Sequence, residues 1–235
     1  NHRNVVYVIS TVCVILGFIG VAKLKTTGNI VDDIPKKDPL YQDLMFMEKH
    51  FKGVMPFEIS IDTRKKKGVM KLSNIRKIEK LQNILHEYPE LSKPLSVAEV
   101  VKFAKQAYYN GNPSFYKLPN NNEINFMGAY IPEPNTKRKT ILNSFIDTNL
   151  QITRISVQMQ NIGTNDIMRI KEDLKPKIDS IFSPEKYNTL LTGTSVVFLK
   201  GTNYLIRNLL TSLLLAILAI SIIMALLFTS PRMIL

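Results

Sequence analysis

The sequence predicts an α+β domain held between two membrane helices. Two uncharged apolar runs, Val5–Ala22 and Leu209–Phe228, bracket a long polar region. Within that region, short alternating segments typical of strands are interleaved with amphipathic helical patterns. Because both runs are long enough to cross a bilayer, we expect the polar region, residues 26–194, to form a domain on one side of the membrane.

The second run is the stronger membrane signal. Leu209–Phe228 has 20 residues, including eight Leu, four Ile and one Phe, and no charge. A helix of this length spans about 30 Å, the thickness of the hydrocarbon core. Its thirteen large apolar side chains favour insertion by roughly 4 to 8 kcal/mol. We expect residues 195–229 to form the second membrane helix together with an extension outside the membrane.

The first run predicts a membrane helix over residues 1–25. Gly20-Val21-Ala22 would also suit signal-peptide cleavage, but the 18 apolar residues of Val5–Ala22 exceed a usual signal core. The only cysteine, Cys13, lies inside this run, so the chain cannot form an internal disulfide. Because the chain begins at Asn1 and a new apolar stretch starts near Pro231, we expect a piece of a longer protein. Residues 230–235 would then begin a third helix.

The polar region is basic. From Lys23 to Arg207 it holds 29 Lys and Arg against 19 Asp and Glu, a net charge of +10. Such an excess can attract nucleic acid or anionic lipid. No nucleic-acid partner is expected, because recognition motifs are absent and the domain is tethered to a membrane. The densest basic run, Lys65–Lys67, is interpreted as a solvated loop tip rather than a lipid-headgroup contact.

The first half of the domain predicts helix, strand and helix. Apolar residues at spacings of three and four predict a helix over Leu40–Phe51, and strict alternation predicts a strand over Phe57–Asp62. The next helix should be capped by Ser73 or Asn74 and ended by Pro89. Its apolar stripe comprises Ile75, Ile78, Leu81, Leu85 and Tyr88.

The middle of the domain begins with a short apolar link, Leu91–Leu95. Ser96 and Glu99 have the spacing of a capping box, in which each side chain would accept a hydrogen bond from the other residue's amide. The helix that they open should run to about Tyr109. Further on, Phe126–Ile131 is expected to be a short strand or helix.

The second half of the domain predicts a strand, a helix and a final strand. Alternation predicts a strand over Leu150–Gln160, and an apolar stripe predicts the following helix, which Pro176 should bend or break. Tyr187–Thr192 is expected to be the last strand and Gly193 a turn. From about Ser195 the chain should be helical into the second apolar run.

This order of elements resembles the split β-α-β arrangement of ferredoxin-like domains. Two amphipathic helices would cover one face of an antiparallel sheet. The comparison requires Leu91–Leu95 to supply the missing strand.

The sequence predicts no catalytic, metal or cofactor site, and we expect the protein not to be an enzyme. The three histidines are far apart, and no glycine-rich phosphate loop follows a strand. One aromatic set could line an apolar binding wall for substrate, the alternative being ordinary core packing. This set comprises Phe103, Tyr108, Tyr109, Phe115 and Tyr116.

The junction into the second run carries a family resemblance. Gly193-Thr194-Ser195-Val196-Val197, then Asn208–Leu213 and Leu227–Arg232, resemble the start of the second membrane helix of resistance–nodulation–division (RND) exporters, particularly the MMPL branch. The stretch Asp33–Pro39 is similar to the segment that follows the first span in that family. Ile152–Gln160, with Gly163 and its helix, is similar to the later half of the family's porter domain.

This resemblance implies the N-terminal part of one half of a proton-driven exporter in the inner (plasma) membrane. The domain would be an external, periplasmic porter domain that guides hydrophobic or lipid-like substrates. Its partners would be the bilayer, the substrate, and the remaining helices and second porter domain of the full-length chain. The proton-relay acids of the family lie in a later helix, so none is assigned to a residue here.

Two other classes of membrane protein share this layout. A two-span sensor would place an external ligand-binding domain between its helices, and an ABC-type permease subunit would carry such a domain after its first helix. The downstream sequence separates the three classes. An exporter should continue with several spans and then repeat the layout, a sensor with a soluble signalling module, and a permease with two or three spans and no repeat.

Overall fold

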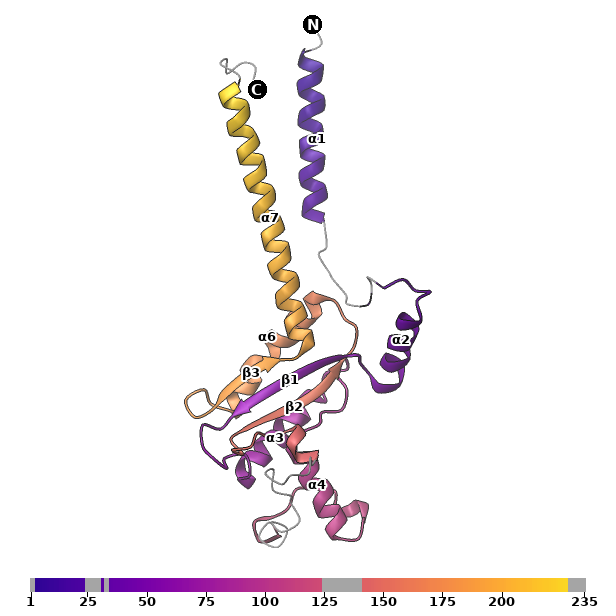
Figure 1. Cartoon of the computed structure of the whole chain (residues 1–235), viewed down its shortest axis with the longest axis vertical. Helices are drawn as coiled ribbons and strands as arrows, with labels where there is room; N and C mark the ends of the chain where they lie inside the picture. The colour runs from indigo at the N-terminus through magenta and orange to yellow at the C-terminus, as the bar shows by residue number, and fades with distance from the viewer. Residues whose placement is uncertain (1–2, 24–30, 32–33, 124–140, 228–235) are drawn as a thin grey trace.

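The three-stranded antiparallel sheet and the helices around it confirm the predicted α+β class (Figure 1). The computed structural model describes residues 3–23, 31, 34–123 and 141–227. Along the chain, the elements are α1 (Arg3–Lys23), α2 (Pro39–Phe51), β1 (Met55–Asp62), α3 (Leu72–Leu85), α4 (Val97–Tyr108), the 3-10 turns η1 (Pro113–Phe115) and η3 (Ile141–Ser144), β2 (Ile152–Met159), α6 (Thr164–Ile181), β3 (Asn188–Thr192) and α7 (Thr194–Leu227).

Strand β1 lies at the centre of the sheet, in the order β2-β1-β3, and both pairings are antiparallel. Ile59 is opposite Ile155 on one side and Leu191 on the other. Every second residue of β1 is buried, as its alternating sequence predicts. These side chains form one core with the apolar stripes of α3 and α6, so the two predicted helix stripes are confirmed.

The link Leu91–Leu95 runs along the free edge of β2. Leu91 bridges to Met159 and Leu95 to Ser156, both antiparallel, with no continuous strand between them. The amides of Ser92 and Leu95 donate to the carbonyls of Gln158 and Ser156, each at 2.8 Å. Pro94 has no amide to donate, which contributes to the interrupted pairing.

The predicted cap of α3 is wrong. The N-cap residue is Lys71, without any side-chain hydrogen bond, and the helix ends at Leu85, before Pro89. Asn74 is buried, and its amide nitrogen donates to the carbonyl of Gly68 at 2.7 Å. The Asn74 side chain therefore ties the preceding loop to the helix, which leaves it unavailable as a cap.

The capping box is half correct. Ser96 is the N-cap of α4, but its hydroxyl accepts from the amide of Ala98 at 3.0 Å instead of from Glu99. The carboxylate of Glu99 binds Lys102 and Tyr116 and does not return to the Ser96 amide. Lys102 and Tyr116 therefore occupy the two carboxylate oxygens, one of which a capping box would direct to the Ser96 amide.

Of the bend or break predicted at Pro176, the break is wrong, because α6 continues from Thr164 to Ile181. Leu174 and Ile178, on either side of the proline, are fully buried. Burying each such side chain contributes roughly 1.5–3 kcal/mol, which together offsets the roughly 3 kcal/mol that an interior proline costs.

Two long helices, α1 and α7, project from the same end of the body (Figure 1). Within the described residues, α7 is the one helix long and apolar enough to cross a membrane, and the shorter apolar stretch Val5–Gly17 lies in α1. Every residue from Leu209 to Leu227 is exposed. The expectations for Phe126–Ile131 and for residues 230–235 lie outside the described residues.

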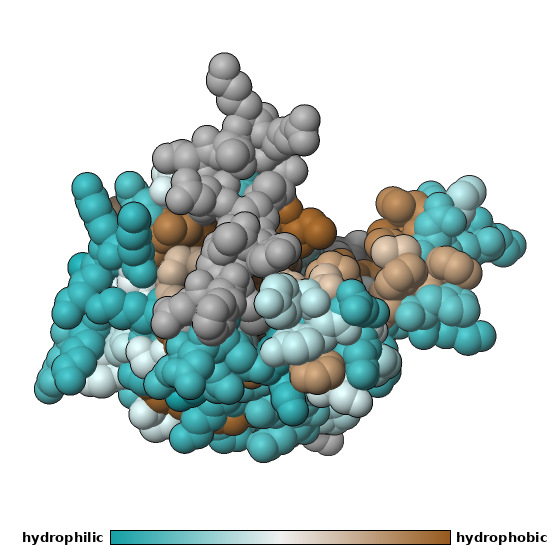
Figure 2. Space-filling view, turned by 90° about the horizontal axis from the view of Figure 1, so that it is seen from below, coloured by the Kyte–Doolittle hydropathy of each residue, from teal (hydrophilic) through white to brown (hydrophobic). Residues whose placement is uncertain are grey.

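Helix α2 stands apart from the core, and none of its residues is buried (Figures 1 and 2). It ends at Phe51 as predicted and begins at Pro39, one residue before the predicted start. Asp38 caps it by accepting from the amide of Leu40 at 2.8 Å. Phe46, Met47 and Phe51 are exposed on its surface.

The start of α7 is anchored in the sheet. Gly193, between β3 and α7, has φ +99°, and a Cβ there would lie 2.5 Å from the carbonyl oxygen of Pro56. The hydroxyl of Ser195 donates to the same carbonyl at 2.9 Å. Val196 and Leu199 are each 2% exposed and belong to the core. Helix α7 therefore begins within the core of the folded domain and continues into its exposed apolar part.

This geometry predicts opposite effects for two glycine substitutions. Gly193→Ala should lower the free energy of unfolding by about 1–3 kcal/mol, because alanine disfavours positive φ and its methyl group meets Pro56. Gly201→Ala, inside α7 with open space around it, should raise it by about 0.5–1 kcal/mol. Denaturant unfolding of the full chain in detergent measures both, and equal effects would contradict the junction described above.

Candidate functional site

The predicted aromatic residues lie on and just after α4, at the end of the body away from α1 and α7 (Figure 1). Tyr109 stacks on Phe115 with ring centroids 4.0 Å apart, and Tyr108 meets Tyr109 edge-on at 5.2 Å. Phe103 is 62% exposed on the surface of α4. The structure thus brings three of the five rings together, and contact with a substrate stays a prediction.

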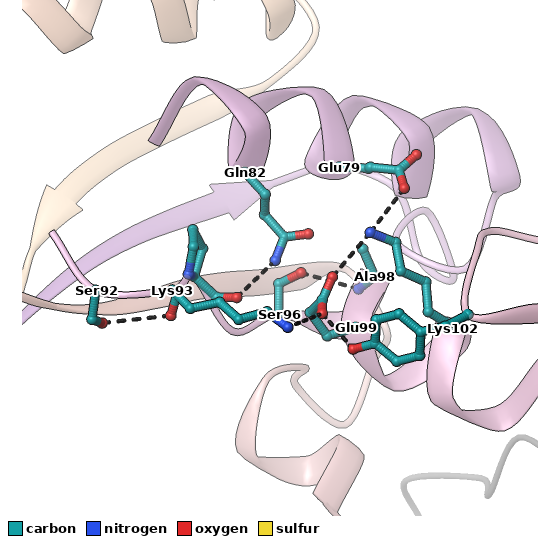
Figure 3. Close-up of polar contacts among 10 residues, drawn as sticks. Glu79, Gln82, Ser92, Lys93, Ser96, Ala98, Glu99 and Lys102 are labelled. Carbon is teal, nitrogen blue, oxygen red and sulfur yellow. Dashed lines mark hydrogen bonds and ion pairs between the residues drawn. The ribbon is translucent and has the colours of Figure 1, made fainter. Parts of the chain in front are cut away.

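The fifth aromatic residue, Tyr116, belongs to a charged cluster between α3 and α4. We call Glu79, Lys93, Glu99, Lys102 and Tyr116 the α3–α4 ion cluster. The ammonium of Lys102 lies 2.9 Å from Glu79 and 3.0 Å from Glu99 (Figure 3). Lys93 lies 3.6 Å from Glu99 and over the ring of Tyr116.

Glu99 and Lys102 are largely buried, with side chains 12% and 14% exposed. Burial is the largest influence on the pKa of Glu99 and would raise it, but hydrogen bonds from Tyr116 and Lys102 and the charges of Lys102 and Lys93 outweigh burial and lower it. Burial likewise opposes the charge of Lys102, and Glu79 and Glu99 together still raise its pKa.

Tyr116 donates its hydroxyl hydrogen to the carboxylate of Glu99. Burial, followed by this bond and the negative charge of Glu99, raises the pKa of Tyr116 to about 12. The ammonium of Lys102 on α4 is paired with Glu79 on α3 as well as with Glu99, so the α3–α4 ion cluster braces the two helices against each other.

A second pair in this region was missed by sequence reasoning. Lys105 is 3% exposed, and its ammonium lies 2.7 Å from the carboxylate of Glu123. Tyr109 donates to the same carboxylate at 3.4 Å, which joins this ion pair to the aromatic stack. The spacing along the helix could have indicated the burial of Lys105. It lies four residues after the buried Val101, and residues four apart lie on the same face of a helix.

No cluster of three or more His, Cys, Asp or Glu side chains suited to a metal ion occurs in the described part of the chain. His50 packs against Phe46 with ring centroids 4.4 Å apart, and His86 lies at the C-cap of α3.

No known protein family matches the chain, and no curated protein matches it.

The α3–α4 ion cluster predicts a pH-dependent stability. The lowered pKa of Glu99 contributes stability above its ordinary value near 4.5, and this contribution is lost as the pH falls through the folded-state pKa. Glu99→Gln should lower the free energy of unfolding at neutral pH by about 1–3 kcal/mol. The difference from the unsubstituted protein should shrink in acid.

Unfolding by urea at a series of pH values measures this effect. Glu87→Gln is the matched control, because Glu87 is exposed and its carboxylate forms no ion pair with any described residue. A deficit for Glu99→Gln that is the same at every pH would contradict the account.

Proposed function

We propose that the chain is a segment of an RND-type exporter of the MMPL branch, in which α1 and α7 cross the membrane. The observation that carries the proposal is the continuity of α7, which begins in the core of the domain and ends as an exposed apolar helix. A water-soluble protein rarely exposes so large an apolar surface, so the exposed part of α7 requires lipid or other apolar helices around it.

The topology of the domain supports a ferredoxin-like porter domain. With Leu91–Leu95 counted as an interrupted edge strand, the strands lie in the order β3, β1, β2, link, and all neighbours are antiparallel. Helix α3 connects β1 to the link, and α6 connects β2 to β3, as in a split β-α-β unit. Helix α4 is then an insertion between the link and β2.

The proposed location is the inner (plasma) membrane, as part of a multi-pass protein with the domain on the external, periplasmic side. The domain would guide hydrophobic or lipid-like molecules past the aromatic stack of Tyr108, Tyr109 and Phe115, at the end of α4, the helix that lies at the end of the domain away from α1 and α7. Proton coupling would belong to other helices, because the described residues of α7 from Leu209 onward carry no ionisable side chain.

A two-span sensor is the second candidate, because α1 and α7 leave the same end of the domain (Figure 1). The sequence after residue 235 would distinguish an exporter from a sensor, and would distinguish an ABC-type permease from both. Several further spans, one with a buried acidic residue, followed by a second copy of this layout, support the exporter. A soluble kinase-like module would rule it out.

Single cysteines test the proposed topology in intact cells. In a Cys13→Ser background, Lys66→Cys and Asn121→Cys should react with a membrane-impermeant maleimide added from outside, because both positions are exposed on the domain. Arg3→Cys, at the far end of α1, is the control and should react only after lysis. Labelling of Lys66→Cys and Asn121→Cys only after lysis would place the domain in the cytoplasm and contradict the exporter proposal.

A further inference from the structure

A basic cavity lies at the end of the sheet where β1 ends and β3 begins. Its volume is about 410 Å³, within the range of small-molecule sites. Four cationic side chains line it, against the single carboxylate of Glu185. These cations are Arg64, Lys65, Lys71 and Lys186. Hydrophilic side chains crowd this end of the molecule in Figure 2, on the left.

The four cations are not neutralised by the protein. In the described part of the chain, none of them forms an ion pair with a carboxylate. Arg64 donates instead to the backbone carbonyl of Glu185 at 3.1 Å, which holds its guanidinium at the rim without cancelling its charge. Like charges gathered around one cavity repel each other, and an anion in the cavity would relieve this repulsion.

Hydrogen bonds among buried and half-buried side chains hold the wall of the cavity in place. The buried Asn74 donates to the carbonyl of Gly68 and accepts from the hydroxyl of Tyr187 at 2.8 Å, which joins the loop, α3 and the start of β3. Lys77 donates to the same hydroxyl and lies 4.4 Å from the centre of that ring. Gly68 has no room for a side chain, because a Cβ would lie 2.1 Å from the Thr63 hydroxyl oxygen.

The start of α3 adds to the positive field. Lys71, Ser73 and Asn74 line the cavity, so the first turn of the helix opens into it. That turn carries no acidic residue, and its N-cap is a lysine without a side-chain bond. The partial positive charge of a helix N-terminus is normally met by an acidic or hydroxyl cap, and here it is reinforced by lysine.

We propose that this cavity binds a phosphate-type anion, such as the phosphate or diphosphate group of a small molecule or of a lipid headgroup. The cavity supplies one guanidinium, three ammonium groups and the Ser73 hydroxyl, which are the donors that phosphate oxygens accept from. Lys65 thus has a role that its neighbour Lys66 does not share, since Lys66 does not line the cavity. The proposal does not depend on transport.

Calorimetric titration of the full chain with inorganic diphosphate tests the proposal, in nanodiscs of phosphatidylcholine. The double substitution Lys65→Gln with Lys186→Gln should weaken binding at least about tenfold, or 1.4 kcal/mol. The matched control is Lys66→Gln with Lys80→Gln, two exposed lysines outside the cavity that remove the same total charge. The control should leave the affinity within about twofold.

Nanodiscs that contain phosphatidic acid distinguish the two sources of the phosphate group. If lipid headgroups reach the cavity, they should compete with diphosphate and weaken its apparent affinity, and the Lys65/Lys186 variant should lose this competition. If the natural ligand is soluble, the lipid should have no effect on diphosphate binding. The proposal is overturned if diphosphate binds no better than chloride at equal ionic strength, or if both double variants weaken binding equally.

Discussion

The contact between the start of α7 and the Pro56 carbonyl of β1 is the constraint on which the rest of the architecture depends. Ser195 donates to that carbonyl, and the close approach of Gly193 to it leaves no space for a side chain. Val196 and Leu199 extend the anchor into the core. The exposed apolar part of α7 is therefore a continuation of a helix that begins in the core of the domain.

Charged side chains have two different roles in the domain: those of the α3–α4 ion cluster pair with each other, and those of the basic cavity are available to a ligand. Between α3 and α4, Lys102 is paired with Glu79 and Glu99, and the lowered pKa of Glu99 and the raised pKa of Lys102 both favour the charged forms of these two side chains. At the N-terminal end of α3, the cations around the basic cavity have no such partners among the described residues. The helix is braced through Glu79 near its middle, and its N-terminal end presents a positive field to a ligand.

The regular elements could be predicted from the sequence because each depends on local periodicity. The alternation of β1 and the apolar stripe of α3 each match the buried positions. The cap of α3 could not be predicted, because the side chain of Asn74 is used over a longer distance: it binds Tyr187, 113 positions along the chain. The pairing of Tyr116 with Glu99 and the burial of Lys105 also depend on how α4 packs against its neighbours. The basic cavity combines residues from two distant loops, and only the Lys65–Lys67 run signalled it.

Hydrogen–deuterium exchange of the full chain in nanodiscs tests the central claim that the domain and α7 are one folded unit. The amides of Val197–Lys200 should exchange as slowly as those of Phe57–Ile61 in the central strand, because both belong to the same cooperative core. Exchange at Val197–Lys200 as fast as in the exposed loop around Lys66 would show that a flexible linker joins the domain to the apolar helix, and would contradict the account.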